Sequence, residues 1–264
     1  MVEIRVSPSA TKLGPECNDA VVICGSHGGL IVGWLAAKAG VRAVILSDAG
    51  IGREGAGIAA LAQLQAVGMA AATVAHDSAR IGDGQDMAAR GRISRVNEAA
   101  AALGVTAGMA VGAAAERLRR APKPFGQVPE PVESRFLLED GPIKIWGIDS
   151  ASLVRPEDAG QVVLTGSHGA LLGGKPETAI AQPVRACLFN DAGIGIDQAG
   201  VSRLPALDGR GIAAATLDAV SCRIGDARSA WEDGVVSRVN RAAEAMGARV
   251  GMTTKEICRR FAGR

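Results

Sequence analysis

The chain predicts an α/β protein made of two similar Rossmann-like halves, each with a parallel sheet, related by a pseudo-twofold axis. Three observations support this prediction. Short apolar runs alternate with segments of helical periodicity. The same sequence blocks occur twice in the same order. The composition, with 35 glycines, no tyrosine and 3% aromatic residues, implies a core of Ala, Val, Ile and Leu, which suits closely packed layers.

The repeated blocks define the two halves. Because chance does not produce four matches in one order, we infer an internal duplication with halves over 1–120 and 142–264. The intervening residues 121–141 contain four prolines and predict a stiff, extended linker. The matching pairs are 22–28 with 163–169, 48–52 with 191–195, 80–83 with 223–226, and 94–97 with 237–240.

The sequence pattern of each half predicts the same succession of strands and helices. We expect three or four strands in the sheet of each half. The strands are apolar, β-branched runs that end near glycine, and the helices show apolar side chains at three- and four-residue steps. Thr253 and Glu256 have the spacing of a capping box that opens a final helix. In the first half we expect strands over 4–6, 20–24, 41–46 and 69–75, and helices over 30–39, 54–67 and 92–103.

Glycine-rich loops follow the three main strands of each half. The carboxyl ends of parallel strands share one edge of the sheet, so we expect these loops to converge there. Backbone N–H groups in such loops favour a carboxylate, a phosphate or an oxyanion. The alternative is that the glycines only form tight turns. The candidate substrate-binding residues are Gly25, Gly28, Gly50, Gly52, Arg80, Gly166, Gly169, Asn190, Gly193, Gly195 and Arg223.

The three histidines of the chain, His27, His76 and His168, all lie in these loops. Histidines scattered over the surface would not all fall in these loops, so their placement favours a role in acid–base chemistry. A metal site is a weaker alternative, with Asp48, Asp77 and Asp191 as further ligands, because the histidine spacing matches no zinc motif. A third alternative is that the histidines cap their loops. The candidate catalytic residues are Ser26, His27, Asp48, His76, Asp77, Ser167, His168 and Asp191.

Several of these residues have a second interpretation. Ser26 with His168, and Ser167 with His27, are candidate nucleophile–base pairs. Asp48, Asp83, Asp191 and Asp226 are equally suited to cap helix N-termini. Arg80 and Arg223 can bind a substrate carboxylate or pair with a neighbouring aspartate. Asn97 and Asn240, in a block predicted to be helical, are expected to tie that helix to a loop.

The two halves differ in their ionisable groups. His76 and Asp77 of the first half stand opposite Ala219 and Val220 of the second. We therefore expect an asymmetric small molecule at a site formed by the loops of both halves, with more of its ionisable groups from the first half. Asp77 is the expected partner that orients a histidine. Cys222, opposite Ala79, is expected to be a buried apolar side chain.

The expected function is an enzyme that hydrolyses an amide, imide or lactone bond of a small anionic metabolite. Lyase or isomerase chemistry, and a non-catalytic sensor of such an anion, are the alternatives. No dinucleotide or ATP motif is present, so the cofactor stays open. The net charge of +2 excludes the strong positive field with which proteins attract nucleic acid. Whether the chain forms a homo-oligomer is left open.

Neither a membrane span nor an oxidising compartment is expected. Residues 99–115 carry no charge, but their counterpart 242–258 carries four charged residues, which argues against a span. Five cysteines without a CxxC pair, and no signal peptide, favour the cytoplasm.

Overall fold

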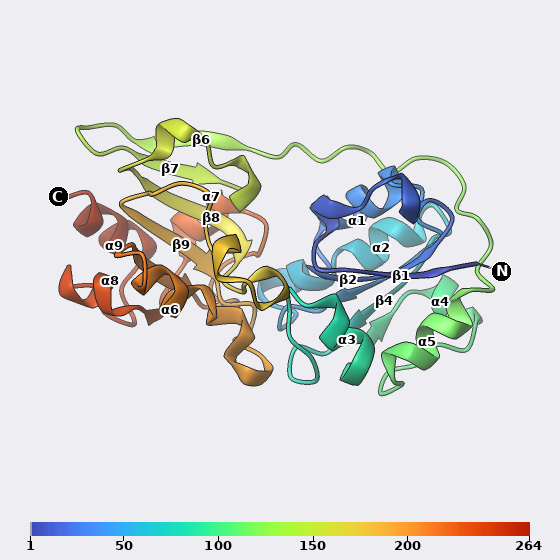
Figure 1. The fold of residues 1–264 in the computed structure, drawn as a ribbon. Coiled ribbons are helices and arrows are strands. Elements are labelled where there is room, and N and C mark those ends of the chain that lie inside the picture. Colours follow the sequence, from blue (N-terminus) through green and yellow to red (C-terminus); the bar gives the residue numbers. More distant parts are fainter. Residues whose placement is uncertain (1) are drawn as a thin grey trace. The chain divides into compact units, whose positions relative to one another are not determined.

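The computed structural model describes residues 2–264 and divides them into two compact units. The first unit comprises the residues up to 51, residues 55–131 and residues 195–197. The second comprises residues 52–54, 132–194 and 198–264. Each unit is an α/β structure with one mixed, mainly parallel sheet and helices on both of its faces (Figure 1).

The predicted parallel sheet of three or four strands in each half is wrong in number, because antiparallel edge strands extend both sheets to five and six strands. The sheet of the first unit has its five strands in the order β1-β2-β3-β4-β5. The first four strands are parallel, and β5 is antiparallel to β4. The strands are β1 (Ile4–Ser7), β2 (Val21–His27), β3 (Ala43–Ser47), β4 (Ala70–Val74) and β5 (Ile93–Val96). The helices are α1 (Leu30–Lys38), α2 (Ala60–Gln65), α3 (Gly84–Arg90), α4 (Glu98–Ala102) and α5 (Val111–Leu118).

The central strands of this unit are apolar without alternation because helices cover both faces of the sheet. On one face, Val22, Val44 and Ala71 pack with α1 and α2. On the other face, Ile23 and Ile45 pack with residues of α3, α4 and α5. Figure 1 shows these two helical layers on either side of the strands. The side chains of consecutive strand residues therefore enter two separate cores.

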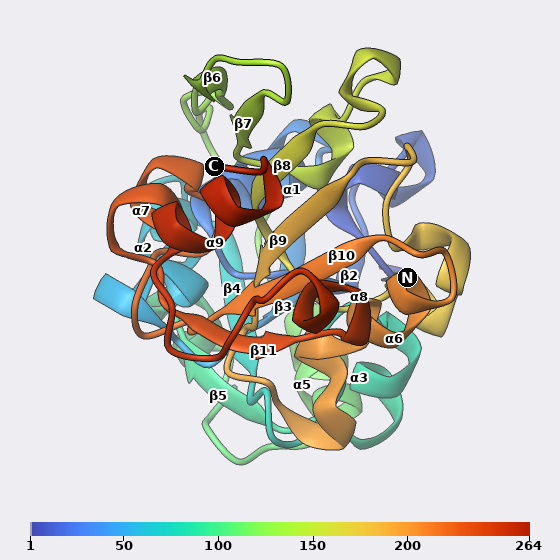
Figure 2. The same ribbon diagram turned by 90° about the vertical axis from the view of Figure 1, so that its left-hand side faces the viewer.

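The sheet of the second unit has six strands in the order β11-β10-β9-β8-β7-β6, which Figure 2 shows from β11 near the bottom to β6 at the top. Strands β7 to β10 are parallel, and both edge strands are antiparallel to their neighbours. The strands are β6 (Arg135–Glu139), β7 (Ile145–Ile148), β8 (Val162–His168), β9 (Ala186–Asn190), β10 (Ala213–Leu217) and β11 (Val236–Val239). The helices are α6 (Arg203–Asp208), α7 (Ala227–Asp233), α8 (Arg241–Ala245) and α9 (Thr254–Phe261).

The predicted helix over 92–103 is wrong in its first half. Residues Ile93–Val96 form the antiparallel edge strand β5, and only Glu98–Ala102 is helical. The β-branched residues Ile93 and Val96 suit a strand as well as a helical face. Asn97 ends the strand and caps α4 through a hydrogen bond from Ala100 N. The Ser-Arg-Val-Asn block of the second unit follows the same pattern in β11 and α8.

Other helical expectations need smaller corrections. The predicted helix over 54–67 is divided into a 3-10 segment, Arg53–Ile58, and α2. Between β8 and β9 the chain forms only the 3-10 turns Leu172–Gly174 and Pro176–Thr178. Left-handed backbone at Glu54, Gly55, Gly173 and Gly174 interrupts a regular helix at these places.

The structure also bears on the predicted capping box, the predicted linker and the predicted absence of a membrane span. The capping box of Thr253 and Glu256 is confirmed at the start of α9. The segment predicted as a linker, 121–141, contains strand β6. Within residues 2–264, every helix is too short or too polar to cross a membrane.

Candidate functional site

The three glycine-rich loops of each unit meet at the carboxyl ends of its strands. In the first unit, Gly82 N donates to Gly25 O at 2.8 Å, and Gly28 N donates to Ser47 O at 2.8 Å. A Cβ on Gly25 would lie 2.6–2.7 Å from backbone atoms of Pro8, Gly82 and Asp83. Glycine is required here because backbone segments approach closely. These glycines therefore serve loop packing, which is the alternative that the sequence left open.

The second unit packs its loops in the same manner. A Cβ on Gly166 would lie 2.6–2.7 Å from backbone atoms of Asp149, Gly225 and Asp226, and Gly169 closely approaches Gly200 O. In both units the strand order is sequential, so neither sheet contains the reversal of strand order that marks the ligand crevice of doubly wound sheets. The loops converge at one edge of each sheet, but the topology alone does not create a crevice there.

A left-handed turn follows β3. Ala49, Gly50, Ile51 and Gly52 have consecutive positive φ angles of 47°, 72°, 64° and 68°. The turn is held by its own residues, since Gly50 N donates to Asp48 Oδ1 and Ile51 N donates to Asp48 O. Each non-glycine residue in this conformation costs about 1–2 kcal/mol, and such strain concentrates at functional sites. The N–H groups of Gly50 and Ile51 are thus bonded within the loop rather than presented to an anion.

The same turn occurs after β9, over residues 192–195. Gly193 N donates to Asp191 Oδ1, and Ile194 N donates to Asp191 O. Asn190 Oδ1 accepts from Ala192 N, and its amide group donates to Cys222 O. We conclude that Asp48 and Asp191, predicted as catalytic or N-capping residues, organise the left-handed turns.

In the first unit, the same carboxylate also holds an imidazole. Asp48 Oδ1 lies 3.1 Å from His76 Nδ1 and accepts the His76 backbone N–H at 3.0 Å. The Asp48 side chain is only 4% exposed, whereas that of His76 is 32% exposed. An ionised carboxylate can only accept, so we assign Nδ1 of His76 as the donor and Nε2 as the basic nitrogen. In the second unit, Ala219 N bonds Asp191 Oδ1 and there is no imidazole at this place.

His27 and His168 cap their own loops. His27 Nδ1 accepts from Gly29 N at 3.1 Å, and His168 Nδ1 accepts from Ala170 N at 3.2 Å. Burial lowers the pKa of His27 to about 4, which keeps its imidazole neutral at physiological pH. His27 therefore fits the capping alternative better than a general base.

The two candidate serines link the strand ends to neighbouring turns. Ser26 Oγ accepts from Ala10 N at 2.9 Å, and Ser167 Oγ accepts from Ala151 N at 2.8 Å. Each hydroxyl thus secures the segment that precedes its strand. The predicted Ser26–His168 and Ser167–His27 pairs stay predictions.

The loop arginines are paired with carboxylates of their own unit. Arg80 contacts Asp197 at 2.9 Å and lies 3.8 Å from Asp86. Arg223 contacts Asp226 and Glu54, each at 2.9 Å. These ion pairs favour the structural interpretation of both arginines over a substrate-binding one.

The remaining aspartates and asparagines of the blocks cap helices. Asp83 caps α3 by accepting from Asp86 N, and Asp226 caps α7 by accepting from Ser229 N. Asn97 Oδ1 accepts from Ala71 N as well as from Ala100 N, and so ties α4 to β4. These interactions account for the repeated residues without chemistry.

Three expectations about reactive groups can be compared with the structure. Asp77 is exposed, and Asp48 rather than Asp77 orients His76. Cys222 is buried, and burial raises the pKa of its thiol to about 11, as suits an inert side chain. Within residues 2–264, no group of three His, Cys, Asp or Glu side chains is arranged to hold a metal ion.

No protein-family model, curated protein or solved structure matches this chain. The pairing of Asp48 with His76 was missed by sequence reasoning because 28 residues separate the two. The available signal was positional, since both residues directly follow neighbouring strands of the predicted sheet.

Proposed function

We propose that the chain is an enzyme that hydrolyses an amide, imide or lactone bond of a small metabolite, with His76 as the general base. The supporting observation is the hydrogen bond between the buried Asp48 carboxylate and the partly exposed His76 imidazole. A carboxylate on Nδ1 fixes the tautomer and stabilises the imidazolium that forms when Nε2 takes a proton. A base of this kind can activate a water molecule for attack on a carbonyl carbon.

The proposal includes an internal duplication in which only the first unit is catalytic. The two units share the Asp-Ala-Gly-Ile-Gly turn and the loop-capping histidine, which supports a common origin. The second unit has Ala219 where the first has His76, so it keeps the scaffold and lacks the base. The pseudo-twofold relation and the anionic character of the substrate stay predictions.

The experiment is a hydrolysis screen with a matched pair of variants. The purified protein is incubated with a panel of lactones, cyclic imides and amides, and mass spectrometry detects the addition of water. In His76→Asn, the amide can still donate to Asp48 but cannot act as a base. In the control His168→Asn, the amide oxygen can still accept from Ala170 N.

We expect His76→Asn to lower kcat/KM by about 10²–10⁴, the usual effect of losing a general base. His168→Asn should change kcat/KM by no more than a few-fold, and both variants should melt close to the parent. Equal losses in the two variants would contradict the role of His76. A compound that raises the melting temperature of the parent without being turned over would instead support the sensor.

A further inference from the structure

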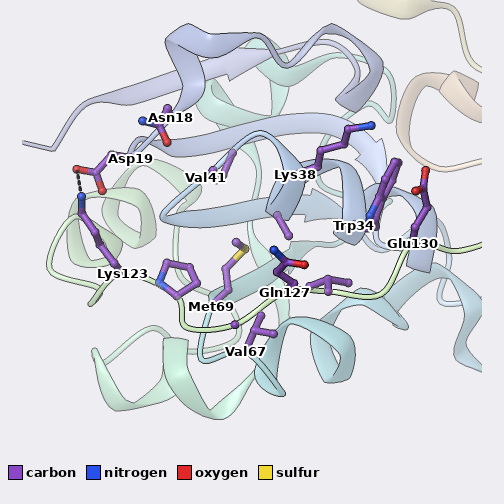
Figure 3. Close-up of a pocket in the computed structure, with 15 residues that line it drawn as sticks. Asn18, Asp19, Trp34, Lys38, Val41, Val67, Met69, Lys123, Gln127 and Glu130 are labelled. Carbon is purple, nitrogen blue, oxygen red and sulfur yellow. Dashed lines mark ion pairs between the residues drawn. The ribbon is translucent and has the colours of Figure 1, made fainter.

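A second candidate site lies in the first unit, at the opposite end of its sheet. A cavity of about 530 Å³ opens at the amino ends of β2, β3 and β4, away from His76. Figure 3 shows Val41, Val67 and Met69 near its middle and Trp34 along one side. The volume lies within the range of small-molecule sites, which are mainly apolar with a few polar groups.

The segment 123–130 forms the remaining wall of the cavity. It is fixed beside the sheet because Phe125 N donates to Val67 O at 2.9 Å and Arg42 Nη1 donates to Ala121 O at 2.8 Å. Lys123, Gln127 and Glu130 of this segment line the cavity. The site is therefore built from elements on two sides rather than from one surface.

At the end of the cavity next to Asp19, this carboxylate is paired with two cations, of which Lys123 lines the cavity and Arg42 does not. Asp19 Oδ1 is bonded by Arg42 Nε at 2.9 Å and Nη2 at 2.7 Å, and Asp19 Oδ2 lies 3.5 Å from Lys123 Nζ. The dashed line in Figure 3 marks the ion pair between Asp19 and Lys123. Asp19 itself has a φ of 63°, a strained conformation held by the bond from its N–H to Gly40 O. Arg42 thus neutralises Asp19 from outside the lining, and the positive charge of Lys123 is left over at this end.

The other end of the cavity offers an aromatic surface. Trp34 lies beside Lys38, whose Nζ is 4.5 Å from the centre of the indole ring. Glu130 lies on the same side in Figure 3, so two lining residues of opposite charge, Lys38 and Glu130, stand at this end. An indole face next to apolar side chains favours a planar ring system over a flexible chain.

We propose that this cavity binds a planar aromatic molecule that carries one negative charge. The rings contact Trp34 and the apolar residues Val41 and Met69, and the anionic group lies toward Lys123 and Asn18. The match of charge supports this occupant, because Arg42 already neutralises Asp19 from outside the lining and the charge of Lys123 is left for an anion. The inference is independent of the proposed hydrolase, because it uses none of the residues near His76.

The test uses two fluorescent probes that differ in one group. 1-Anilinonaphthalene-8-sulfonate has an aromatic body and one sulfonate, and N-phenyl-1-naphthylamine has the same rings without the charge. Both are titrated into the parent, into Lys123→Glu and into the control Lys175→Glu, which makes the same charge change at an exposed residue of the second unit. Gln127→Trp, at an exposed residue of the cavity wall, is the variant that fills the cavity.

We expect one sulfonate probe per chain, bound about fivefold more weakly in Lys123→Glu and unchanged in Lys175→Glu. The uncharged probe should bind more weakly than the sulfonate in the parent and be insensitive to Lys123→Glu. Gln127→Trp should weaken the binding of both probes. Energy transfer from tryptophan to the bound sulfonate should fall in Trp34→Phe and persist in Trp146→Phe.

Three results would overturn the proposal. One is a sulfonate affinity that falls equally in both lysine variants, which would indicate a general charge effect. Another is equal binding of the charged and uncharged probes in the parent. The third is energy transfer that is unaffected by Trp34→Phe, which would place the probe elsewhere. Melting temperatures of all variants confirm that each is folded when measured.

Discussion

His76 differs from the other two histidines in the group that its Nδ1 contacts. Nδ1 of His27 and His168 accepts a backbone N–H, which leaves the proton on Nε2. Nδ1 of His76 faces the Asp48 carboxylate, which leaves the lone pair on Nε2. One residue type therefore has two roles, and the partner atom decides which one applies.

Asp48→Asn and Asp191→Asn should have different consequences. The asparagine oxygen can accept the same backbone N–H groups, so both left-handed turns should persist. Asp48→Asn removes the charge that stabilises the His76 imidazolium, and we expect kcat to fall by about 10²–10⁴. Burial raises the pKa of Asp191, so its neutral replacement removes a costly buried charge and should leave stability equal or higher.

Steady-state kinetics on any substrate from the screen, and thermal melting of both variants, check this prediction. A loss of activity in Asp191→Asn as large as in Asp48→Asn would show that the aspartates act only through the turns.

His27 should make the protein less stable in mild acid. Its pKa is about 4 in the folded chain, below the ordinary value of about 6.5 expected in the unfolded chain. Between pH 6.5 and 4 the unfolded chain therefore binds a proton that the folded chain does not, and stability falls as the pH falls through this window. The full shift corresponds to about 3 kcal/mol, and we expect less because the side chain keeps some exposed surface.

In His27→Asn, the amide oxygen can replace Nδ1 as the acceptor for Gly29 N, and the acid-dependent loss should shrink. Urea unfolding at pH 7 and pH 4.5 measures the difference. Parallel pH profiles of parent and variant would contradict the assignment, because all other titrating groups are common to both.

At the scale of elements, the loops depend on glycines that have no room for a side chain. Gly25 and Gly166 each occupy a position where three backbone segments meet. The clash at both sites is with backbone rather than with the end of a flexible side chain, so relief requires movement of a whole loop. The same sequence position thus has the same packing constraint in both units.

Gly25→Ala and Gly166→Ala should each lower the free energy of unfolding by about 1–3 kcal/mol or more. Gly112→Ala is the matched control, since Gly112 is exposed in α5 and an added Cβ would have no described atom from outside its own stretch of helix within 4 Å. That change should be neutral or stabilising by up to about 1 kcal/mol. Denaturant unfolding monitored by circular dichroism compares the three. Little effect from Gly25→Ala and Gly166→Ala would show that the loops shift easily.

At the scale of the whole molecule, each unit has its own two apolar cores and its own buried cysteines. Cys17 and Cys24 belong to a core of the first unit, and Cys187, Cys222 and Cys258 to those of the second. Burial raises the pKa of all five thiols. Both effects suppress the thiolate that reacts with electrophiles.

The folded chain should therefore react with Ellman's reagent at pH 8 only as it unfolds, and all five thiols should react in denaturant. Mass spectrometry of chains labelled at rising urea concentration assigns the reacting cysteines to the two units. Rapid labelling of Cys222 in the absence of urea would contradict its burial and identify it as a reactive group.

The sequence by itself determined the α/β class, the apolar central strands and the loops at their carboxyl ends. Runs such as 20–24 and 43–46 are apolar at every position, which requires helices on both faces of a sheet. The Thr253 capping box was equally readable, because capping depends on neighbours three residues apart. Local patterns suffice where the interaction itself is local.

The tertiary structure decided the edge strand β5, the left-handed turns and the partner of His76. Ile93 and Val96 fit a helical face and a strand alike, and only pairing with β4 selects the strand. The positive φ angles of Ala49 and Ile51 run against the preference of both residues and depend on Asp48. The Asp48–His76 contact joins the ends of two strands far apart in the chain, and sequence spacing carries no measure of that distance.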